Sequence, residues 1–277
     1  MLTKNYRHLF STIACFMLYC QSLFAQERVV YKHVDTIALA MEIYTPAQEN
    51  SPGKYPVIVF FFGGGWIGGD ISQFRPHAKY FSQRGMVAAL VDYRTFSRYN
   101  TSPFESLEDA KSAIRFLRSN AERFHIDPSR IVASGGSAGG QLAAATATSE
   151  KYNDRNDDTC ISARPDALVL FNPVIDNGPG GYGYDRIGEA YRYFSPLHNL
   201  KQGLPPTILF LGTKDELVPV ETAQYCKKII EKTGGRCDLH LYEGQGHGFF
   251  NYKHREYYKA TLLKSDEFLI SIGLLKT

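Results

Sequence analysis

Net charge, cysteine and long hydrophobic runs are all scarce in this sequence. Its 277 residues carry 31 basic and 28 acidic side chains, so the formal net charge is only +3. That balance argues against a protein that binds nucleic acid or an anionic membrane surface. Beyond the first 25 residues, no stretch is apolar over the roughly 20 positions that a membrane-spanning helix needs. We therefore expect no nucleic-acid partner and no membrane association for the rest of the chain.

The five cysteines form no metal-binding or redox pattern. Cys160, Cys226 and Cys237 lie beyond the first 25 residues, and none has a Cys-x-x-Cys or metal-ligand spacing. An odd number leaves one thiol unpaired or all three free. Spacing alone does not establish whether Cys226 and Cys237, which flank a predicted turn, form a bridge. We interpret all three as structural and predict no metal site.

Residues 1–25 have the features of an export signal. Lys4 and Arg7 supply a basic start, an apolar stretch too short to span a bilayer follows, and a small residue precedes a cut before Gln26. A lipid anchor on Cys20 is an alternative, disfavoured by the bulky residue before it. A buried N-terminal helix is another, disfavoured because the apolar stretch has no polar face. We expect a secreted or periplasmic protein, and removal of the signal lowers the net charge to +1.

Residues 26–277 have the pattern of a single α/β domain, without internal repeat, low-complexity tract or linker. Short apolar runs alternate with helical patterns, which predicts a mostly parallel, twisted sheet of about eight strands with helices on both faces. The expected strands are a hairpin-like pair at 28–34 and 37–44, followed by 57–62, 86–91, 131–133, 167–171, 207–211 and 237–242. The expected helices are 104–124, 138–148, 221–232 and 257–272. Ligands bind at the carboxyl ends of such strands.

Ser137 stands where one strand turns sharply into a helix. Residues 135–139 fit the pattern G-x-S-x-G, after an apolar run and before an alanine-rich one. Glycines on both sides of the serine avoid clashes with the neighbouring strand and helix, so the hydroxyl stands clear at the top of the sheet. This predicts a nucleophile, and the alternative is an ordinary turn of small residues. Ser134 lacks the flanking glycines, so we interpret it as structural.

A triple glycine follows the strand at 57–62. Glycines let the loop backbone fold closely and turn its N–H groups inward, where they stabilise the negative charge that develops on a carbonyl oxygen during acyl transfer. We expect the N–H groups of Gly64, Gly65 and Ala138 to form this oxyanion hole. The alternative is a flexible loop. Trp66 either lines the acyl pocket or covers the loop.

A candidate acid and a candidate base follow the last two strands. Asp215 can hold the tautomer of a histidine and stabilise its imidazolium form. Glu216 and Asp176 are alternative acids, which we interpret as a solvated side chain and a turn residue. His247 lies between glycines in a loop that such a fold places over Ser137. The remaining histidines lack such a setting, and we interpret them as surface or core residues.

These stretches resemble the α/β-hydrolase superfamily, in the branch of acetyl xylan and feruloyl esterase-like enzymes, and are similar to hormone-sensitive-lipase-like esterases. The chain order Ser137, Asp215, His247 is the order of that fold. The resemblance runs from Val57 to the final helix. It rests on residues 62–66, 92–94, 127–131, 135–139, 215–219 and 246–249. It implies the α/β-hydrolase fold and hydrolysis of a small-molecule or oligosaccharide ester without a cofactor.

Two departures narrow the resemblance. Phe62 stands where the lipase-like group has a histidine, and the stretch from Gln26 to Gly63 is too short for a large N-terminal cap. Both favour the carbohydrate-esterase branch, that is, a secreted serine carboxylesterase that removes acetyl or, second, feruloyl groups. A serine peptidase of the same fold is an alternative, although such enzymes usually carry a further large N-terminal domain. A non-catalytic binding protein of this fold is another, although it would be expected to have lost one of the three residues.

Residues 172–203 are too long for a simple connection between two strands. They contain several tyrosines, among them Tyr182 and Tyr184. One hypothesis is a short flap over the site, which offers aromatic faces to a sugar or an aromatic acyl group. The alternative is an ordinary helical excursion packed with tyrosines. With Trp66, these two tyrosines are the candidate substrate contacts.

Overall fold

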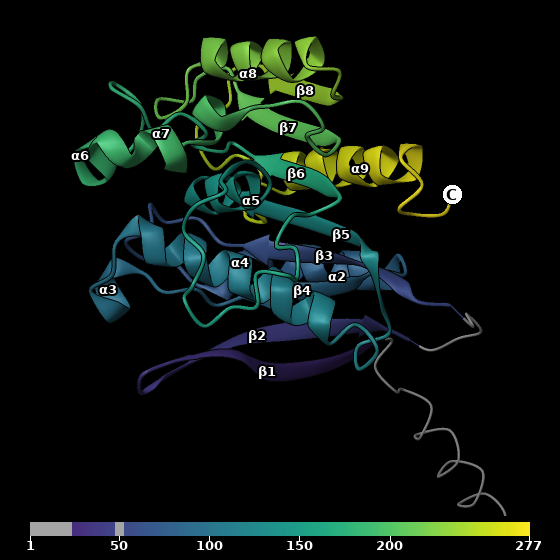
Figure 1. Cartoon of the computed structure of the whole chain (residues 1–277). Coiled ribbons are helices and arrows are strands. Elements are labelled where there is room, and N and C mark those ends of the chain that lie inside the picture. The colour runs from purple at the N-terminus through teal and green to yellow at the C-terminus, as the bar shows by residue number, and fades with distance from the viewer. Residues whose placement is uncertain (1–23, 48–52) are drawn as a thin grey trace, which may run out of the picture.

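An eight-stranded sheet organises the computed structural model, which describes residues 24–47 and 53–277 (Figure 1). Its order is β1-β2-β4-β3-β5-β6-β7-β8. The strands are β1 Phe24–Val34, β2 Ile37–Pro46, β3 Tyr55–Phe61, β4 Val87–Val91, β5 Ile126–Gly136, β6 Ala167–Phe171, β7 Thr207–Gly212 and β8 Cys237–Tyr242. β1, β2 and β4 pair antiparallel, and the pairs from β4 to β8 are parallel. The expected fold class is confirmed.

The central strands are buried because helices cover both faces of the sheet. Every residue of β4, β6 and β7 is buried, which explains why these stretches are continuous apolar runs rather than alternating ones. β5 begins at Ile126, earlier than expected, because Ile126 pairs with Tyr55 ahead of a register shift. Of the predicted export signal, residues 1–23 lie outside the described part of the chain.

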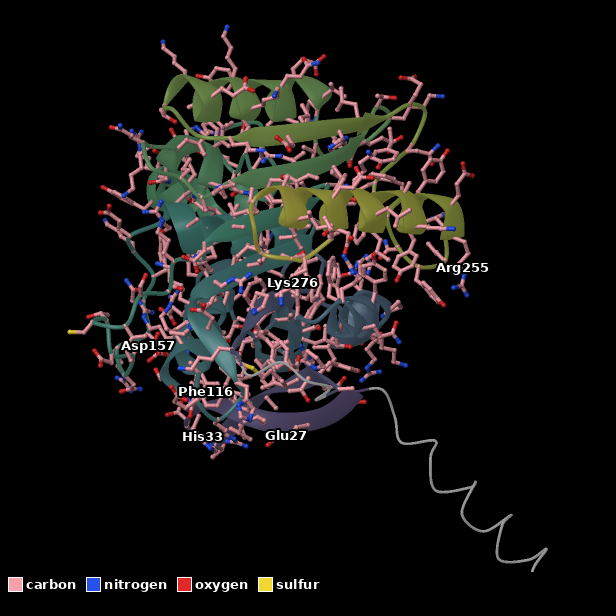
Figure 2. All side chains as sticks on the ribbon, turned by 90° about the vertical axis from the view of Figure 1, so that its right-hand side faces the viewer. Glu27, His33, Phe116, Asp157, Arg255 and Lys276 are labelled. Atoms are coloured by element: carbon pink, nitrogen blue, oxygen red, sulfur yellow. The ribbon has the colours of Figure 1, made fainter. Side chains whose placement is uncertain are left out.

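The helices form two layers. Those of eight or more residues are α2 Arg75–Gln83, α4 Pro103–Ser119, α5 Ala138–Thr148, α8 Val220–Lys232 and α9 Arg255–Ser271. α4 lies in front of the sheet and α2 behind it (Figure 1). In the turned view of Figure 2, α9, in yellow, lies on the side of the molecule away from Phe116 of α4. None of the helices in the described ranges is both long and apolar enough to cross a bilayer.

The long helices differ from the expected ones in two places, the end of α4 and the presence of α2. α4 begins as expected, after a capping box in which Ser102 and Glu105 bond each other's backbone N–H. It ends at Ser119, because the residues after it form turns that bond to Asn120 and Ala121. α2 was not predicted. It is short, and only four of its residues are buried.

The three cysteines beyond the first 25 residues are free thiols in this structure. Cys160 is exposed, whereas Cys226 and Cys237 are buried. Burial raises the pKa of the Cys237 thiol to about 12 and that of the Cys226 thiol still further. A thiol that stays protonated is a poor nucleophile, as expected of structural cysteines.

A histidine without a hydrogen-bond partner in the described part of the chain lies inside the core. His77 of α2 is completely buried, and neither ring nitrogen has a partner among the described residues. Its ring packs against Phe74 at 5.0 Å, Phe171 at 5.4 Å and Tyr258 at 4.8 Å between ring centres. Burial therefore lowers its pKa from 6.5 to about 3, because the charged ring would lose its hydration.

This setting predicts a pH-dependent stability that depends on His77. Below pH 6.5 the unfolded chain binds a proton that the folded chain does not, so acid favours unfolding until the folded pKa near 3 is reached. The free energy of unfolding of the wild type should fall by about 1.4 kcal/mol per pH unit in that range through this group. His77→Phe should lose this part of the slope, as measured by urea unfolding between pH 7.5 and 4.5. The exposed His33 supplies the control, because His33→Gln should keep the slope. An unchanged slope in His77→Phe would contradict the argument.

Candidate active site

Ser137 occupies a strained turn between β5 and α5. Its φ is +54° and its ψ is −120°, a conformation that L-residues adopt only when the surroundings impose it. The surroundings are glycines: a Cβ on Gly139 would lie 2.0 Å from the carbonyl oxygen of Phe61, and one on Gly135 would lie 2.4 Å from the backbone of Gly139. The Ser137 N–H donates to the Phe171 carbonyl at 3.0 Å. The start of α5 is thus pressed against the sheet, and the serine side chain remains at its edge.

Three side chains from distant segments form one hydrogen-bonded line. The Nε2 atom of His247 lies 2.8 Å from the Ser137 Oγ, and its Nδ1 lies 2.7 Å from the Asp215 Oδ2. The other carboxylate oxygen of Asp215 accepts from the N–H groups of Leu217 at 2.9 Å and Val218 at 3.0 Å. With Nδ1 protonated toward the carboxylate, Nε2 is free to accept the serine proton. The three residues selected from the sequence therefore meet in space.

The alternative residues lie elsewhere. Asp176 accepts from the N–H of Gly178 at 2.9 Å and lies 3.8 Å from the Nδ1 of His198. Glu216 is exposed. Ser134 is completely buried inside β5, and its hydroxyl has no partner among the described residues.

The triple-glycine loop lies directly against the nucleophile. A Cβ on Gly63 would lie 3.3 Å from that of Ser137. Gly64 and Gly65 have φ values of +126° and +66°, which glycine adopts without steric cost. Their N–H groups have no acceptor among the described residues. The N–H of Ala138 is also without an acceptor, because it belongs to the first residue of a helix.

Side-chain amides hold this loop in place. The N–H of Gly63 donates to the Gln73 Oε1 at 2.7 Å, and the Gln73 Nε2 donates to the Asn251 Oδ1 at 2.9 Å. Asn251 in turn donates to the Gly248 carbonyl at 2.8 Å. The chain of bonds links the glycine loop to the loop of His247. Sequence reasoning missed both amides, and neither follows a recognisable motif.

A third side-chain amide, that of Asn172, contacts His247 directly. Asn172, the residue after β6, accepts from the Gly248 N–H at 3.0 Å through its Oδ1, and its Nδ2 lies 3.3 Å from the Nε2 of His247. It is buried and has a φ of +34°. Sequence reasoning used this residue only to mark the start of 172–203. Its position at the carboxyl end of a parallel strand was the signal that could have identified it.

Residues 172–203 pack on the glycine loop through short helices, α6 Tyr184–Ile187 and α7 Tyr191–Phe194 (Figure 1). Arg186 donates to the Gly65 carbonyl at 2.5 Å, and its guanidinium lies 5.2 Å from the ring centre of Trp66. Trp66 is 1 % exposed, so it covers the loop, the second of the two alternatives for this residue.

The two candidate tyrosines differ in position. The Tyr182 ring lies 5.7 Å from that of Trp66, and a Cβ on Gly65 would lie 2.7 Å from its hydroxyl oxygen. Tyr182 therefore borders the glycine loop. Tyr184 donates to Glu189 at 2.9 Å, and both residues belong to the same short helical stretch.

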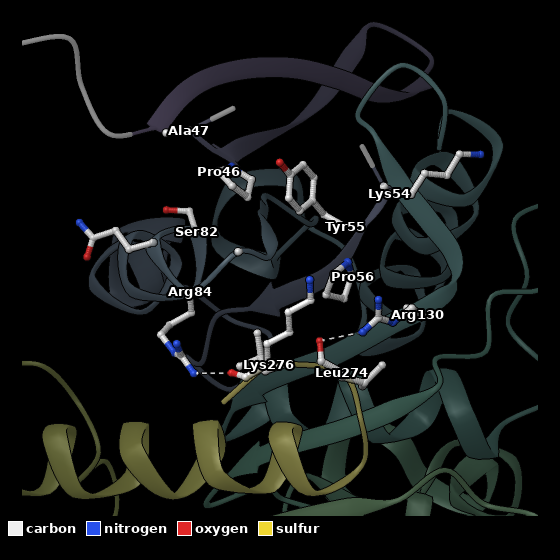
Figure 3. Close-up of a pocket in the computed structure, with 14 residues that line it drawn as sticks. Pro46, Ala47, Lys54, Tyr55, Pro56, Ser82, Arg84, Arg130, Leu274 and Lys276 are labelled. Carbon is white, nitrogen blue, oxygen red and sulfur yellow. Dashed lines mark hydrogen bonds between the residues drawn. The ribbon is translucent and has the colours of Figure 1, made fainter. Parts of the chain in front are cut away.

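A cavity elsewhere in the described part of the chain is separate from this edge of the sheet. Figure 3 shows a cavity at the amino end of β3, lined by residues that include Tyr55, Arg84, Arg130 and Lys276. It lies at the opposite ends of the strands from Ser137. Within the described ranges, no group of three or more His, Cys, Asp or Glu side chains is placed to hold a metal ion.

Known proteins share both the sequence pattern and the fold. Residues 41–179 match the BD-FAE family, and residues 166–265 match the prolyl oligopeptidase family. A solved structure of esterase 2 from Thermogutta terrifontis, phosphoramylated by tabun, is 43% identical with a TM-score of 0.88, over 94% of this chain and 99% of that one. Other structures of that esterase have propionate or butyrate bound.

Curated relatives are more distant. A probable isoprenylcysteine α-carbonyl methylesterase of Arabidopsis thaliana is 28% identical over 75% of this chain and 48% of its own length. An acetylxylan esterase of Xylanibacter ruminicola is 27% identical over 73% of this chain and 42% of its own. The chain thus spans about half the length of the curated relatives it matches. It belongs to the BD-FAE family, within the α/β-hydrolase fold, and the relatives and structural neighbours named here are esterases.

The amide support of the glycine loop predicts a graded loss of stability at Gln73. Gln73→Leu removes the acceptor of the Gly63 N–H and the donor to Asn251, so the free energy of unfolding should fall by about 1–3 kcal/mol. Gln73→Glu keeps an acceptor for Gly63 and should lose less. Urea unfolding of both variants measures the difference. Equal stability of the leucine variant and the wild type would show that the bond to Gly63 does not hold the loop.

Proposed function

We propose that this member of the BD-FAE family is a serine carboxylesterase that works through an acyl-enzyme formed on Ser137. The observation that carries the proposal is the hydrogen-bonded line from Ser137 through His247 to Asp215, next to glycine N–H groups that have no acceptor among the described residues. A hydroxyl, an imidazole and a buried carboxylate in this order activate an oxygen nucleophile. The esterase structures of the same fold support the reaction class.

In the proposed mechanism, His247 acts first as base and then as acid. Its Nε2 takes the proton of Ser137 while the serine oxygen attacks the ester carbonyl carbon, and the carbonyl oxygen becomes negatively charged. The N–H groups of Gly64, Gly65 and Ala138 donate to that oxygen. Each such donor typically contributes about 2.7–4 kcal/mol to catalysis. His247 then protonates the leaving alcohol, and a water molecule repeats the sequence to release the acid.

We further propose that the acyl group is short and that the alcohol is a carbohydrate. The hydroxyl of Tyr182 borders Gly65 closely and limits the space beside the proposed oxyanion hole. Propionate and butyrate bound to the Thermogutta esterase support a short acyl group. The acetylxylan esterase relative supports an acetylated sugar. A feruloyl ester is second, and Tyr182 is the proposed substrate contact in both cases.

The place of action is also proposed from the sequence. Residues 1–25 combine a basic start, an apolar stretch and a small residue before Gln26, which supports export and cleavage. The mature protein would act outside the cytoplasm, where polysaccharide esters are accessible. N-terminal sequencing of the exported protein tests this part, and a mature chain that keeps residues 1–25 would contradict it.

The nucleophile is tested by a matched pair of serine variants. Ser137→Ala should lower kcat/KM for p-nitrophenyl acetate by at least about a thousandfold, because it removes the attacking oxygen. Ser134→Ala should stay within a few-fold of the wild type, because that hydroxyl is buried in β5 and has no partner among the described residues. Full turnover by a folded Ser137→Ala protein would overturn the proposal.

The substrate class is tested by comparing acyl chains and leaving groups. Acetyl, propionyl and butyryl p-nitrophenyl esters should have kcat/KM at least tenfold higher than the decanoyl ester, because the space beside Gly65 is limited. Acetylated xylo-oligosaccharides should release acetate faster than feruloylated ones release ferulate. A prolyl p-nitroanilide should remain intact; its cleavage with no ester turnover would favour a peptidase, the activity suggested by the match to the prolyl oligopeptidase family.

A further inference from the structure

The side chain of Asn172 faces the ring nitrogen that the proposed reaction uses. Its Nδ2 lies 3.3 Å from the Nε2 of His247, the same nitrogen that lies 2.8 Å from the Ser137 Oγ. The amide cannot be turned around without loss, because its Oδ1 accepts from the Gly248 N–H at 3.0 Å and a backbone N–H can only donate. The Nδ2 group is therefore fixed as a donor next to Nε2.

The backbone of Asn172 keeps the side chain in this position. Its φ of +34° is unusual for a residue other than glycine, although asparagine tolerates this region better than most. Its N–H donates to the Phe210 carbonyl at 2.7 Å, which ties it to the end of β7. The residue is buried, so solvent does not compete for its amide.

A fixed donor beside Nε2 discriminates between the protonation states of the imidazole. An unprotonated Nε2 carries a lone pair that can accept from an N–H, whereas a protonated Nε2 would face another donor. The carboxylate of Asp215 acts on the opposite nitrogen, where it holds the proton on Nδ1. The two side chains together favour one tautomer, in which Nε2 is free to take the proton of Ser137.

We propose that Asn172 is a positioning residue that keeps the Nε2 of His247 unprotonated between catalytic cycles, a role that rests on the proposed esterase function. It does so from β6, the strand between those that carry the serine and the acid. No proton passes through Asn172 itself, and the substrate does not need to contact it.

The charges around His247 make this effect measurable. Among the described residues, Asp215 from the loop after β7 is the charged side chain in contact with the ring. The neutral contacts are Ser137 from the start of α5 and Asn172 from the end of β6. Lys214, Glu216 and Glu243 on the neighbouring loops are exposed to solvent. A new carboxylate at position 172 would thus be the second charge at the ring.

Asn172→Asp provides the test, because it keeps the size of the side chain and an acceptor for Gly248. It replaces the donor beside Nε2 by a carboxylate oxygen, which should stabilise the protonated ring. The acid limb of the pH profile of kcat/KM for p-nitrophenyl acetate should move to higher pH by about one unit or more. A residue with only a structural role would lower kcat or stability but leave the limb in place. Asn251→Asp is the control, because Asn251 lies in the same amide chain without contacting the ring, and its shift should be clearly smaller.

Nuclear magnetic resonance of the ¹⁵N-histidine-labelled protein gives a readout that needs no substrate. In the wild type at pH 7.5, His247 should show a protonated Nδ1 and an unprotonated Nε2. Asn172→Asp should show a larger fraction of rings protonated on both nitrogens than the wild type at the same pH. A wild-type ring protonated on Nε2, or an acid limb unchanged in a folded Asn172→Asp protein, would overturn the assignment of Asn172. A failure of the proposed esterase function is a different result, namely full ester turnover by the Ser137→Ala protein.

Discussion

The close contact between the first turn of α5 and the ends of β3 and β5 is the constraint on which the site depends. Gly135 and Gly139 bring backbone to within distances that any side chain would block, and this contact forces Ser137 into its strained conformation. The cost of such strain is of the order of 1–3 kcal/mol, and it persists because the surrounding sheet over-determines it. The serine gains a fixed place relative to the glycine loop after β3 and the amide after β6.

The register of the parallel sheet explains how distant segments of the chain meet. Gly135 pairs with Phe61, and Gly136 pairs with Phe171. Phe171 pairs with Phe210, so the ends of β3, β5, β6 and β7 lie at one edge. Ser137 and Asn172 directly follow β5 and β6, and Gly64 and Asp215 lie three residues after the ends of β3 and β7. The geometry of the site is thus a property of the sheet, and the loops add local support through neutral amides and the guanidinium of Arg186.

Much of this arrangement was predictable from the sequence, because it depends on strong local patterns. Continuous apolar runs identify buried parallel strands, and glycines at fixed offsets identify Ser137 and the loop at Gly64. Other features depend on tertiary contacts without a local pattern. Gln73 has its role only because the short 3-10 helix Ile71–Phe74, directly before α2, brings its side chain to Gly63. Trp66 looked equally suited to line a pocket or to cover a loop, and only its burial in the folded chain, with Arg186 packed on its ring, distinguishes the two.

The hydrogen bond from Arg186 to the Gly65 carbonyl also has an evolutionary consequence. The excursion between β6 and β7 lies outside the sheet, and segments of that kind tolerate insertion and replacement better than the strands they connect. Yet here it carries the guanidinium that fastens the glycine loop. A lineage that exchanged this excursion for another, in order to accept a new ester, would lose the fastening unless the new segment supplied one. Diversification of substrates in this protein is therefore expected to proceed by small changes around a retained arginine rather than by wholesale exchange of the excursion.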